Sequence, residues 1–359
     1  MFYELIELLY SIFTPFRVFG YLTFRSAFAA LTTLLICFIF GAKIIEYLRK
    51  LKIGQSVRED GPQTHLVKSG TPTMGGIFII MAVVIAMLFW GNLQNRVIWI
   101  TMGAFLAFGI IGFIDDYLKV TRKNSAGLPV LAKLAGQFAV AIAVVLIIYF
   151  TGDEKTTALY IPFFKDPVFD MGWVWIPFAV LLVVGESNAV NFSDGLDGLL
   201  AGLLIIVFLT LAILTYITGR IDFSEYLGIP YIPEAGELTV FCLAAAGACV
   251  GFLWFNAYPA EVFMGDVGSL SLGGVIAVIS LITKKEILLL VIGGVFVLEI
   301  ASVIIQVISF KLTGKRVFKM APIHHHYEMM GWSEQKTVIR FYILGGLFTI
   351  IALSTLKIQ

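Results

Sequence analysis

The stretch RVIWITMGAFLAFGIIGFIDDYLK, residues 96–119, sets a long apolar run directly against two aspartates. Residues 96–114 approach the length of about 20 mainly apolar residues that a helix needs to cross a bilayer. Asp115 and Asp116 stand at the end of that run. A carboxylate in hydrocarbon costs roughly 2.5 to 3.5 kcal/mol at a helix centre and less near the helix ends, so this placement indicates a functional site.

Similar apolar runs recur along the whole chain, in which 59% of residues are hydrophobic and 14% are charged. Because soluble domains rarely reach this balance, the sequence predicts an all-α integral membrane protein of about ten transmembrane helices, in a single polytopic domain over residues 1–359. A short interfacial helix is expected before residue 21. The expected spans are residues 21–45, 74–92, 96–114, 131–150, 173–190, 199–218, 238–255, 268–283, 287–310 and 339–356.

Lysines and arginines orient these spans. Ten spans place both termini on one side of the membrane, and the loops on the other side carry most of the positive charge. The positive-inside rule therefore puts those loops in the cytoplasm and both termini outside. The cytoplasmic loops would be residues 46–73, 115–130, 191–198, 256–267 and 311–338. The aspartates Asp115, Asp116, Asp194, Asp197 and Asp266 and the triple histidine His324–His326 all fall in them, which predicts an active site at the cytoplasmic face.

Overall charge and cysteine usage exclude several other classes. A net charge of +1 gives no reason to expect a nucleic-acid partner. Cys37, Cys242 and Cys249 lie in apolar stretches without metal-ligand spacing, so they are expected to act as small hydrophobic residues. Glu4 and Glu7 stand where a removable signal peptide would have a basic start, so no such peptide is expected.

Three aspartate clusters carry candidate chemistry. Asp115 and Asp116 could bind a divalent cation or supply a base, or they could form a solvated helix end in which Asp115 pairs with Lys119. In NAVNFSDGLDGL, residues 188–199, Asn191, Asp194 and Asp197 would share one face if helical. The glycines of that stretch equally allow a turn close to a ligand, or a loop that merely satisfies its own backbone.

The third cluster is NAYPAEVFMGDVGSLSLG, residues 256–273, in which Asp266 precedes the eighth expected span. Asp266 could be a simple helix cap, but Mg²⁺ held by Asp266 would bring phosphate oxygens to exposed helix N–H groups. The ring of Phe263 nearby could stack on a base or a sugar.

Two further loops are rich in groups that suit phosphate. In GKRVFKMAPIHHHYE, residues 314–328, His324, His325 and His326 are consecutive and cannot all face one way, so phosphate donors or proton carriers fit better than a three-histidine zinc site. A plain polar loop is the alternative. HLVKSGTPTMGG, residues 65–76, has a phosphate-binding composition without the order of a nucleotide triphosphatase loop, and it could equally end a loop for close helix packing.

Together these strings identify a family resemblance. KSGTPTMGG, GFIDDY, NAVNFSDGLDGL, GFLWFNAYPAEVFMGDVGSL and MAPIHHHYE resemble the motifs of the bacterial phospho-N-acetylmuramoyl-pentapeptide-transferases, within the polyprenyl-phosphate N-acetylhexosamine-1-phosphate transferase superfamily. The resemblance runs from about residue 20 to the C-terminus. It implies a Mg²⁺-dependent enzyme of the bacterial inner membrane that joins UDP-N-acetylmuramoyl-pentapeptide to undecaprenyl phosphate, a membrane lipid, and forms lipid I and UMP.

The resemblance also implies roles for individual residues. Asp266 looks like the Mg²⁺ ligand, Asp115 and Asp116 like the pair at the attacking lipid phosphate, and His324 like a catalytic histidine at the phosphates. Positions similar to substrate-binding residues are Lys68, Thr73, Lys119, Lys133, Asn191, Asp194, Asp197, Asn256, Phe263, Gln306, His325 and His326.

Several alternatives stay open at this point. A sibling transferase acting on UDP-N-acetylglucosamine would share the aspartates but need a different histidine loop. A transporter would use buried acids, of which Glu299 is the most deeply placed, although helix packing suits Glu299 better. A two-step route through an aspartyl phosphate is chemically possible. The small residues Gly273–Gly274 and Gly293–Gly294 could pack helices or a second protomer, and the family resemblance favours a homodimer.

Overall fold

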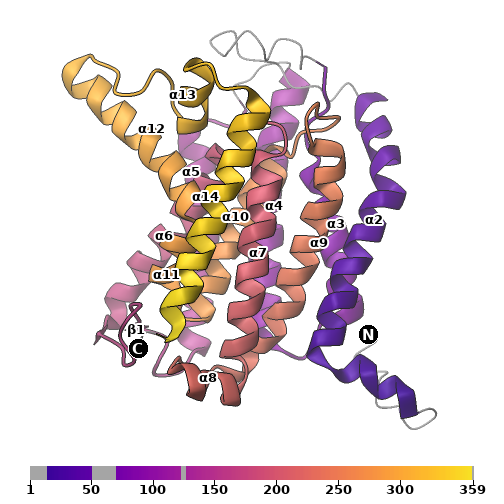
Figure 1. Ribbon diagram of the computed structural model, residues 1–359, viewed down its shortest axis with the longest axis vertical. Helices are drawn as coiled ribbons and strands as arrows, with labels where there is room; N and C mark the ends of the chain where they lie inside the picture. Colours follow the sequence, from indigo (N-terminus) through magenta and orange to yellow (C-terminus); the bar gives the residue numbers. More distant parts are fainter. Residues whose placement is uncertain (1–13, 51–69, 123–126, 358–359) are drawn as a thin grey trace.

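The computed structural model describes residues 14–50, 70–122 and 127–357, and its long helices run side by side from one end of the molecule to the other (Figure 1). Within those ranges, nine helical segments are long and apolar enough to cross a membrane. The main helices of these segments are α2 (Leu22–Lys50), α4 (Arg96–Arg122), α5 (Val130–Thr151), α6 (Trp175–Phe192), α7 (Leu199–Thr218), α9 (Leu238–Asn256), α10 (Gly265–Ile282), α12 (Gly294–Thr313) and α14 (Glu334–Ser354). The predicted all-α membrane architecture is confirmed.

The expected second span corresponds to α3 (Gly76–Trp90), an apolar helix of 15 residues. At 1.5 Å per residue such a helix is about 22 Å long, shorter than a hydrocarbon core of about 30 Å. Its N-terminus is joined to the start of α10, because Gly75 N donates to Phe263 O (2.9 Å) and Gly76 N donates to Met264 O (2.9 Å). The short helix α3 therefore begins beside the polar segment that leads into α10.

Several elements differ from the predicted ones. The expected span 287–310 is two helices, α11 (Glu286–Ile292) and α12, which meet at Gly293. Apolarity continues through this break, so hydropathy alone gives no sign of it. Helix α4 continues to Arg122, although its span was expected to end at residue 114. Asp115 and Asp116 lie inside the helix and are buried against protein. The histidine loop contains a helix of about two turns, α13 (Ile323–Met329).

Short elements close the end of the bundle opposite α13 (Figure 1). They are η1 (Thr14–Gly20), β1 (Ala158–Leu159), β2 (Phe169–Asp170), η3 (Gly172–Val174), α8 (Ile221–Leu227), η4 (Pro233–Glu237) and η5 (Thr355–Lys357). β1 and β2 pair antiparallel, with Ala158 opposite Asp170. Residues 152–172 and 219–237 therefore hold only short strands and helices between the long helices.

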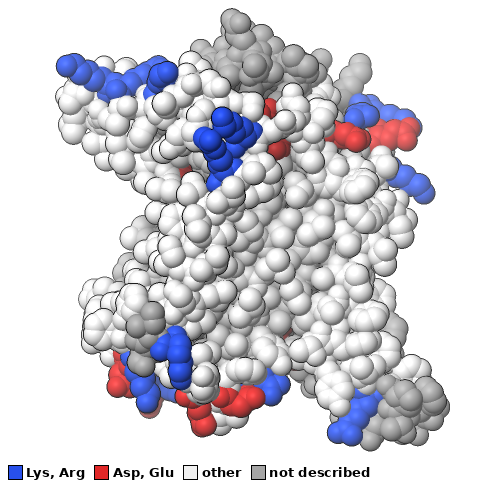
Figure 2. Space-filling view, in the orientation of Figure 1, with Lys and Arg blue, Asp and Glu red and all other residues white. Residues whose placement is uncertain are grey.

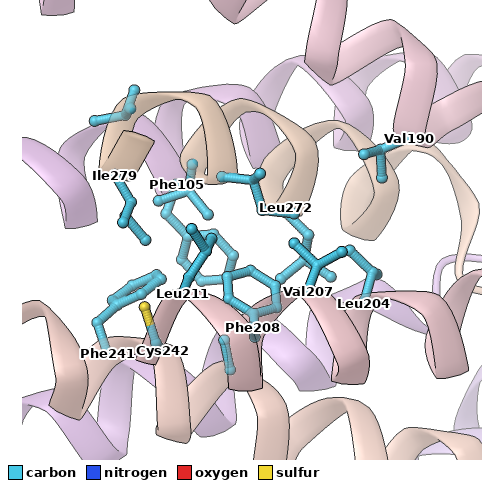
Figure 3. Close-up of a cluster of buried hydrophobic side chains, with 14 of the residues drawn as sticks. Phe105, Val190, Leu204, Val207, Phe208, Leu211, Phe241, Cys242, Leu272 and Ile279 are labelled. Carbon is cyan, nitrogen blue, oxygen red and sulfur yellow. The ribbon is translucent and has the colours of Figure 1, made fainter. Parts of the chain in front are cut away.

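Helix α10 forms the centre of the bundle. Every residue from Val267 to Ile282 is buried, and the helix packs against α4 and α6. In the close-up, Phe105 of α4, Phe208 of α7, Phe241 of α9 and Leu272 of α10 converge on one apolar cluster (Figure 3). The central position of α10 fixes the place of the residue at its start, Asp266.

Small residues let the helices approach within this one chain. A Cβ added at Gly274 would lie 2.6 Å from the ring of Phe108, and one added at Gly273 would lie 2.8 Å from Val190 Cβ. A Cβ at Gly294 would lie 2.8 Å from the ring of Phe348. These glycines therefore pack helices against one another, which is the first of the two roles expected for them. The three cysteines are buried and free, as the sequence predicts.

The face of the molecule seen in Figure 2 has an uncharged girdle between two charged ends. In the space-filling view, lysines, arginines and acids lie at the two ends, and the face between them is uncharged (Figure 2). Large apolar side chains such as Leu181 (62% exposed) and Ile350 (65% exposed) cover the outer face of the helices. A band of this kind fits the hydrocarbon layer of a membrane.

Candidate active site

Three aspartates meet at the end of the bundle that carries α13. Asp115 and Asp116 come from the last turns of α4, and Asp266 comes from the first turn of α10. One oxygen of each carboxylate lies within 4.8 Å of the others. Asp115 and Asp116 are only 3% and 2% exposed. Gly112 makes this meeting possible, because a side chain at Gly112 would overlap the carbonyl group of Asp266.

Two lysines neutralise much of the negative charge. Lys119 Nζ lies 2.6 Å from Asp115 Oδ2, 2.9 Å from Asp266 Oδ2 and 3.3 Å from Asp116 Oδ1. Lys133 Nζ, from α5, lies 2.7 Å from Asp266 Oδ2. The Asp115–Lys119 pair considered from the sequence is present, but its buried setting is not that of a solvated helix end. Three carboxylates face two ammonium groups, so the ionised cluster keeps an excess of negative charge.

Each carboxylate is also held by a neutral donor. Asn191 Nδ2 donates to Asp266 Oδ1 (2.7 Å), Val267 N donates to Asp116 Oδ2 (3.2 Å) and Leu128 N donates to Asp115 Oδ1 (2.8 Å). Asp266 stands at the N-terminus of α10, where the helix dipole favours negative charge. The cluster is therefore fixed from four separate segments of the chain.

An amide pair, Gln137 and Asn188, lies one helical turn away from Lys133 and Asn191. This pair was not predicted from the sequence. Asn188 Nδ2 donates to Gln137 Oε1 (2.7 Å), which joins α6 to α5. Gln137 follows Lys133 by four residues, and Asn188 precedes Asn191 by three, so the pair sets the spacing of the helices that carry Lys133 and Asn191. Two amides within otherwise apolar runs were the only signal of this pair in the sequence.

Asn191, Asp194 and Asp197 each contact the first turn of α10 or the segment that leads into it. Asn191 contacts Asp266, Asp194 Oδ2 accepts from Gly265 N (3.2 Å), and Asp197 Oδ2 accepts from Ala260 N (3.0 Å). Only Asn191 is in a helix, so the shared helical face is wrong and the turn is correct. Gly198, with φ 81°, ends that turn. Removal from water raises the pKa of Asp194 to about 7, and the negative charge of Asp266 adds to this increase.

Three other predicted residues line the same segment. Asn256 Oδ1 accepts from Gly198 N (3.1 Å), and Asn256 Nδ2 donates to Val262 O (2.9 Å). Phe263 N donates to Pro72 O (2.8 Å), which lays the segment beside Thr73. A Cβ added at Gly265 would lie 2.9 Å from Thr73 Oγ1. Lys68 lies outside the described residues.

The three histidines of α13 face three different partners. His324 is fully buried, with Nδ1 3.0 Å from Glu299 Oε2, and its Nε2 edge lies against Gly195. His325 Nδ1 lies 2.7 Å from Glu328 Oε2, and His326 Nδ1 accepts from Lys319 N (3.1 Å). Of these three, His324 is the one packed against the aspartate turn.

Gln306 and Glu299 brace this region from α12. Gln306 Oε1 accepts from Val317 N (3.0 Å) and Phe318 N (2.9 Å), so Gln306 shapes the loop before α13 and does not contact the aspartates. Glu299, considered above as a transport acid, is fully buried and lies against His324. Its surroundings fit the helix-packing role better than a proton pathway.

Comparison with known proteins agrees with this geometry. Residues 98–284, from α4 to the end of α10, match the glycosyl transferase family 4 model. Residues 68–80 match the phospho-N-acetylmuramoyl-pentapeptide-transferase signature 1. The two regions include the aspartate cluster and the segment beside Thr73.

Full-length relatives carry one name. The chain is 53% identical to the phospho-N-acetylmuramoyl-pentapeptide-transferase of Thermodesulfovibrio yellowstonii, with 100% of both chains covered. It is 50% identical to that of Koribacter versatilis, over 99% of this chain and 98% of the relative, and 48% identical to that of Syntrophus aciditrophicus, over 100% of both. The chain therefore belongs to the phospho-N-acetylmuramoyl-pentapeptide-transferase family.

Proposed function

We propose that this protein transfers phospho-N-acetylmuramoyl-pentapeptide from its UDP conjugate to undecaprenyl phosphate, giving lipid I and UMP for peptidoglycan synthesis. The observation that carries the proposal is the meeting of Asp115, Asp116 and Asp266 with Lys119 and Lys133 at one end of a membrane bundle. One substrate is a lipid and the other is water-soluble. A site at the end of the spans is reachable from both phases.

The charges at this cluster suit phosphoryl transfer. The reaction brings together two anionic substrates, so it depends on positioning and on neutralising charge more than on covalent chemistry. Lys119 and Lys133 supply positive charge beside Asp266. A phosphate monoester is largely ionised at neutral pH, so Asp115 and Asp116 need not be strong bases. Their bonds to Lys119 and to backbone N–H groups give them a positioning and electrostatic role.

The same cluster fits Mg²⁺. This ion prefers carboxylate and other oxygen ligands, and the three carboxylates have oxygens within 4.8 Å of one another and excess negative charge. Asp266 would hold the ion, with Asp115 and Asp116 within reach. When bound, Mg²⁺ would neutralise charge on the phosphates. Lys119 and Lys133 would then shift from the carboxylates towards the substrate phosphates.

We place the nucleotide half of the soluble substrate beside this cluster. The 193–198 turn, the segment 260–266 and the stretch around Thr73 converge next to Asp266. Asn191, Asp194, Asn256 and Phe263 would bind the nucleoside there, and His324 would hold the turn at the phosphates. We assign this end of the bundle to the cytoplasm and both termini to the opposite side of the bacterial inner membrane, and we expect a homodimer.

The direct test is UMP release by the purified protein. UMP should form from UDP-N-acetylmuramoyl-pentapeptide only when undecaprenyl phosphate and Mg²⁺ are both present, and EDTA should abolish it. UDP-N-acetylglucosamine should give no UMP. Turnover of that sugar nucleotide alone would assign the chain to the sibling activity, and turnover of neither donor would contradict a transferase.

Gly195 gives a sharper prediction about His324. A Cβ at Gly195 would overlap the imidazole, and the buried ring cannot move away without losing its place beside Glu299. Because a displacement near 1 Å can cost about 100-fold in rate, Gly195→Ala should lower kcat for UMP release about 10- to 100-fold.

The matched control is Gly185→Ala in α6. A Cβ there meets no atom within 4 Å, so kcat should stay at the wild-type value. Equal activity of Gly195→Ala and Gly185→Ala would show that the position of His324 is not critical.

A further inference from the structure

A small cavity lies at the opposite end of the bundle from the aspartate cluster. It is bounded by the loop after β1, the turn between α10 and α11, and the C-terminal element η5. The residues that define its character are Tyr160, Phe164, Ile229, Lys285, Leu288 and Leu356. Most of these side chains are apolar, and Lys285 brings a cation among them. None of them belongs to the proposed active site.

The two neighbouring lysines of this turn differ in their partners. Lys284 Nζ lies 2.5 Å from Glu286 Oε1 and donates to Thr156 O (2.8 Å), so its charge is matched. The backbone of Lys284 is left-handed, with φ 59°. In this turn the side chains of Lys284 and Lys285 therefore meet different neighbours. Lys285 is only 6% exposed and lines the cavity. Among the described residues, none accepts a hydrogen bond from Lys285 Nζ.

The positive charge of Lys285 therefore has no direct partner and is compensated only in part. Glu286 is the one acid in the turn and is already paired with Lys284. Burial lowers the pKa of Lys285 to about 8, and the attraction of Glu286 opposes this decrease only in part. The ammonium form still predominates at neutral pH. A buried, unpaired cation is costly, and an anion in the cavity would remove that cost.

The size of the cavity limits what that anion can be. Its volume open to water is about 20 Å³, while one water molecule needs about 10 to 15 Å³. Only a small group can enter, and the rest of a larger molecule must stay outside. Phe164 lines the cavity and is 57% exposed, and its neighbour Phe163 is equally exposed. Exposed aromatic rings at the end of a membrane bundle are typical of the lipid headgroup level.

We propose that this cavity is an anion site in which Lys285 binds a phosphate oxygen of a membrane lipid headgroup, with the rest of the phosphate and the lipid body lying outside along the apolar girdle. Phosphate is the shared chemistry of a lipid headgroup and the free ion. The lipid is the favoured source because the cavity admits only a small group, and the exposed aromatic rings beside it are typical of the lipid headgroup level. The site would stabilise the turn between α10 and α11 and leave the transfer reaction unchanged.

The test uses the purified full-length protein, freed of lipid in a neutral detergent. Phosphatidylglycerol, phosphatidylcholine or inorganic phosphate is titrated while the Tm is followed, and bound lipid is counted by mass spectrometry. Phosphatidylglycerol should raise the Tm of the wild type more than phosphatidylcholine does. In Lys285→Met and Lys285→Gln this difference should disappear and bound phosphatidylglycerol should fall at least about 10-fold.

The control variant is Lys165→Met, which removes an exposed lysine from the adjacent loop and should respond as the wild type. Without lipid, Lys285→Met should be at least as stable as the wild type, because an unpaired charge is removed. Its UMP release should be unchanged, which separates this site from the proposed function. Inorganic phosphate could raise the Tm as much as the lipid does, in a way that depends on Lys285. That result would support the anion site and identify the free ion as its ligand.

Two results would overturn the proposal. One is equal stabilisation by phosphatidylglycerol in the wild type, Lys285→Met and Lys285→Gln. The other is no Lys285-dependent effect of either phosphate source on the wild type.

Discussion

Asp266→Asn is expected to lower kcat for UMP release about 1,000-fold. Asp266 is the carboxylate that Lys119, Lys133 and Asn191 all contact, and the substitution removes its charge while almost keeping its shape. Loss of a metal ligand or of a single well-placed electrostatic contact typically costs about 100- to 1,000-fold or more, and this residue is proposed to provide both functions. The measurement is UMP release at saturating concentrations of both substrates and Mg²⁺.

Asp222→Asn is the matched control. Asp222 is an exposed aspartate at the other end of the bundle, paired with Arg220 at 2.9 Å. Its replacement should leave kcat within about two-fold of the wild type, as expected for a surface pair. Both variants should keep the wild-type elution volume in detergent, which shows that they are folded. A kcat of Asp266→Asn within three-fold of the wild type would contradict the role given to Asp266.

Gly112→Ala is expected to damage both stability and activity. The added methyl group would overlap the backbone carbonyl of Asp266, and a backbone atom in a central helix cannot rotate away. Helices α4 and α10 must therefore separate, which overpacking data place at about 1 to 3 kcal/mol. Separation moves Asp266 away from Asp115 and Asp116, so kcat should fall about 100-fold. Thermal unfolding in detergent and UMP release measure the two effects.

Gly103→Ala is the control on the same helix. A Cβ at Gly103 meets no atom within 4 Å, and alanine is the better helix former by about 0.5 to 1 kcal/mol. Gly103→Ala should therefore be as stable as the wild type or more stable, with normal kcat. Identical behaviour of the two variants would mean that the contact between α4 and α10 does not position the site.

The sequence was sufficient for most of the spans and for the grouping of the aspartates. Long apolar runs determine where helices cross, and residues at span ends on one side must lie at one end of the bundle. Asp115, Asp116 and Asp266 meet for that reason. Likewise, three consecutive histidines were predicted to face different ways, and His324, His325 and His326 have three different partners.

Other features could not be obtained in this way, because they depend on which neighbour a side chain meets. The break at Gly293 lies inside a continuous apolar run, so hydropathy does not mark it. Asp194 and Asp197 were compatible with a helix or a turn until their contacts with Gly265 and Ala260 were known. The unpaired state of Lys285 follows from Glu286 being taken by Lys284, which only three-dimensional contacts reveal.

Cation binding by the aspartate cluster is the central claim, and Mn²⁺ binding followed by electron paramagnetic resonance tests it most directly. The purified wild type and Asp222→Asn should each bind Mn²⁺ at a site from which Mg²⁺ displaces it. Asp266→Asn should lose that binding while remaining folded. Undiminished, Mg²⁺-competitive Mn²⁺ binding by Asp266→Asn would contradict the assignment of the cation to this cluster.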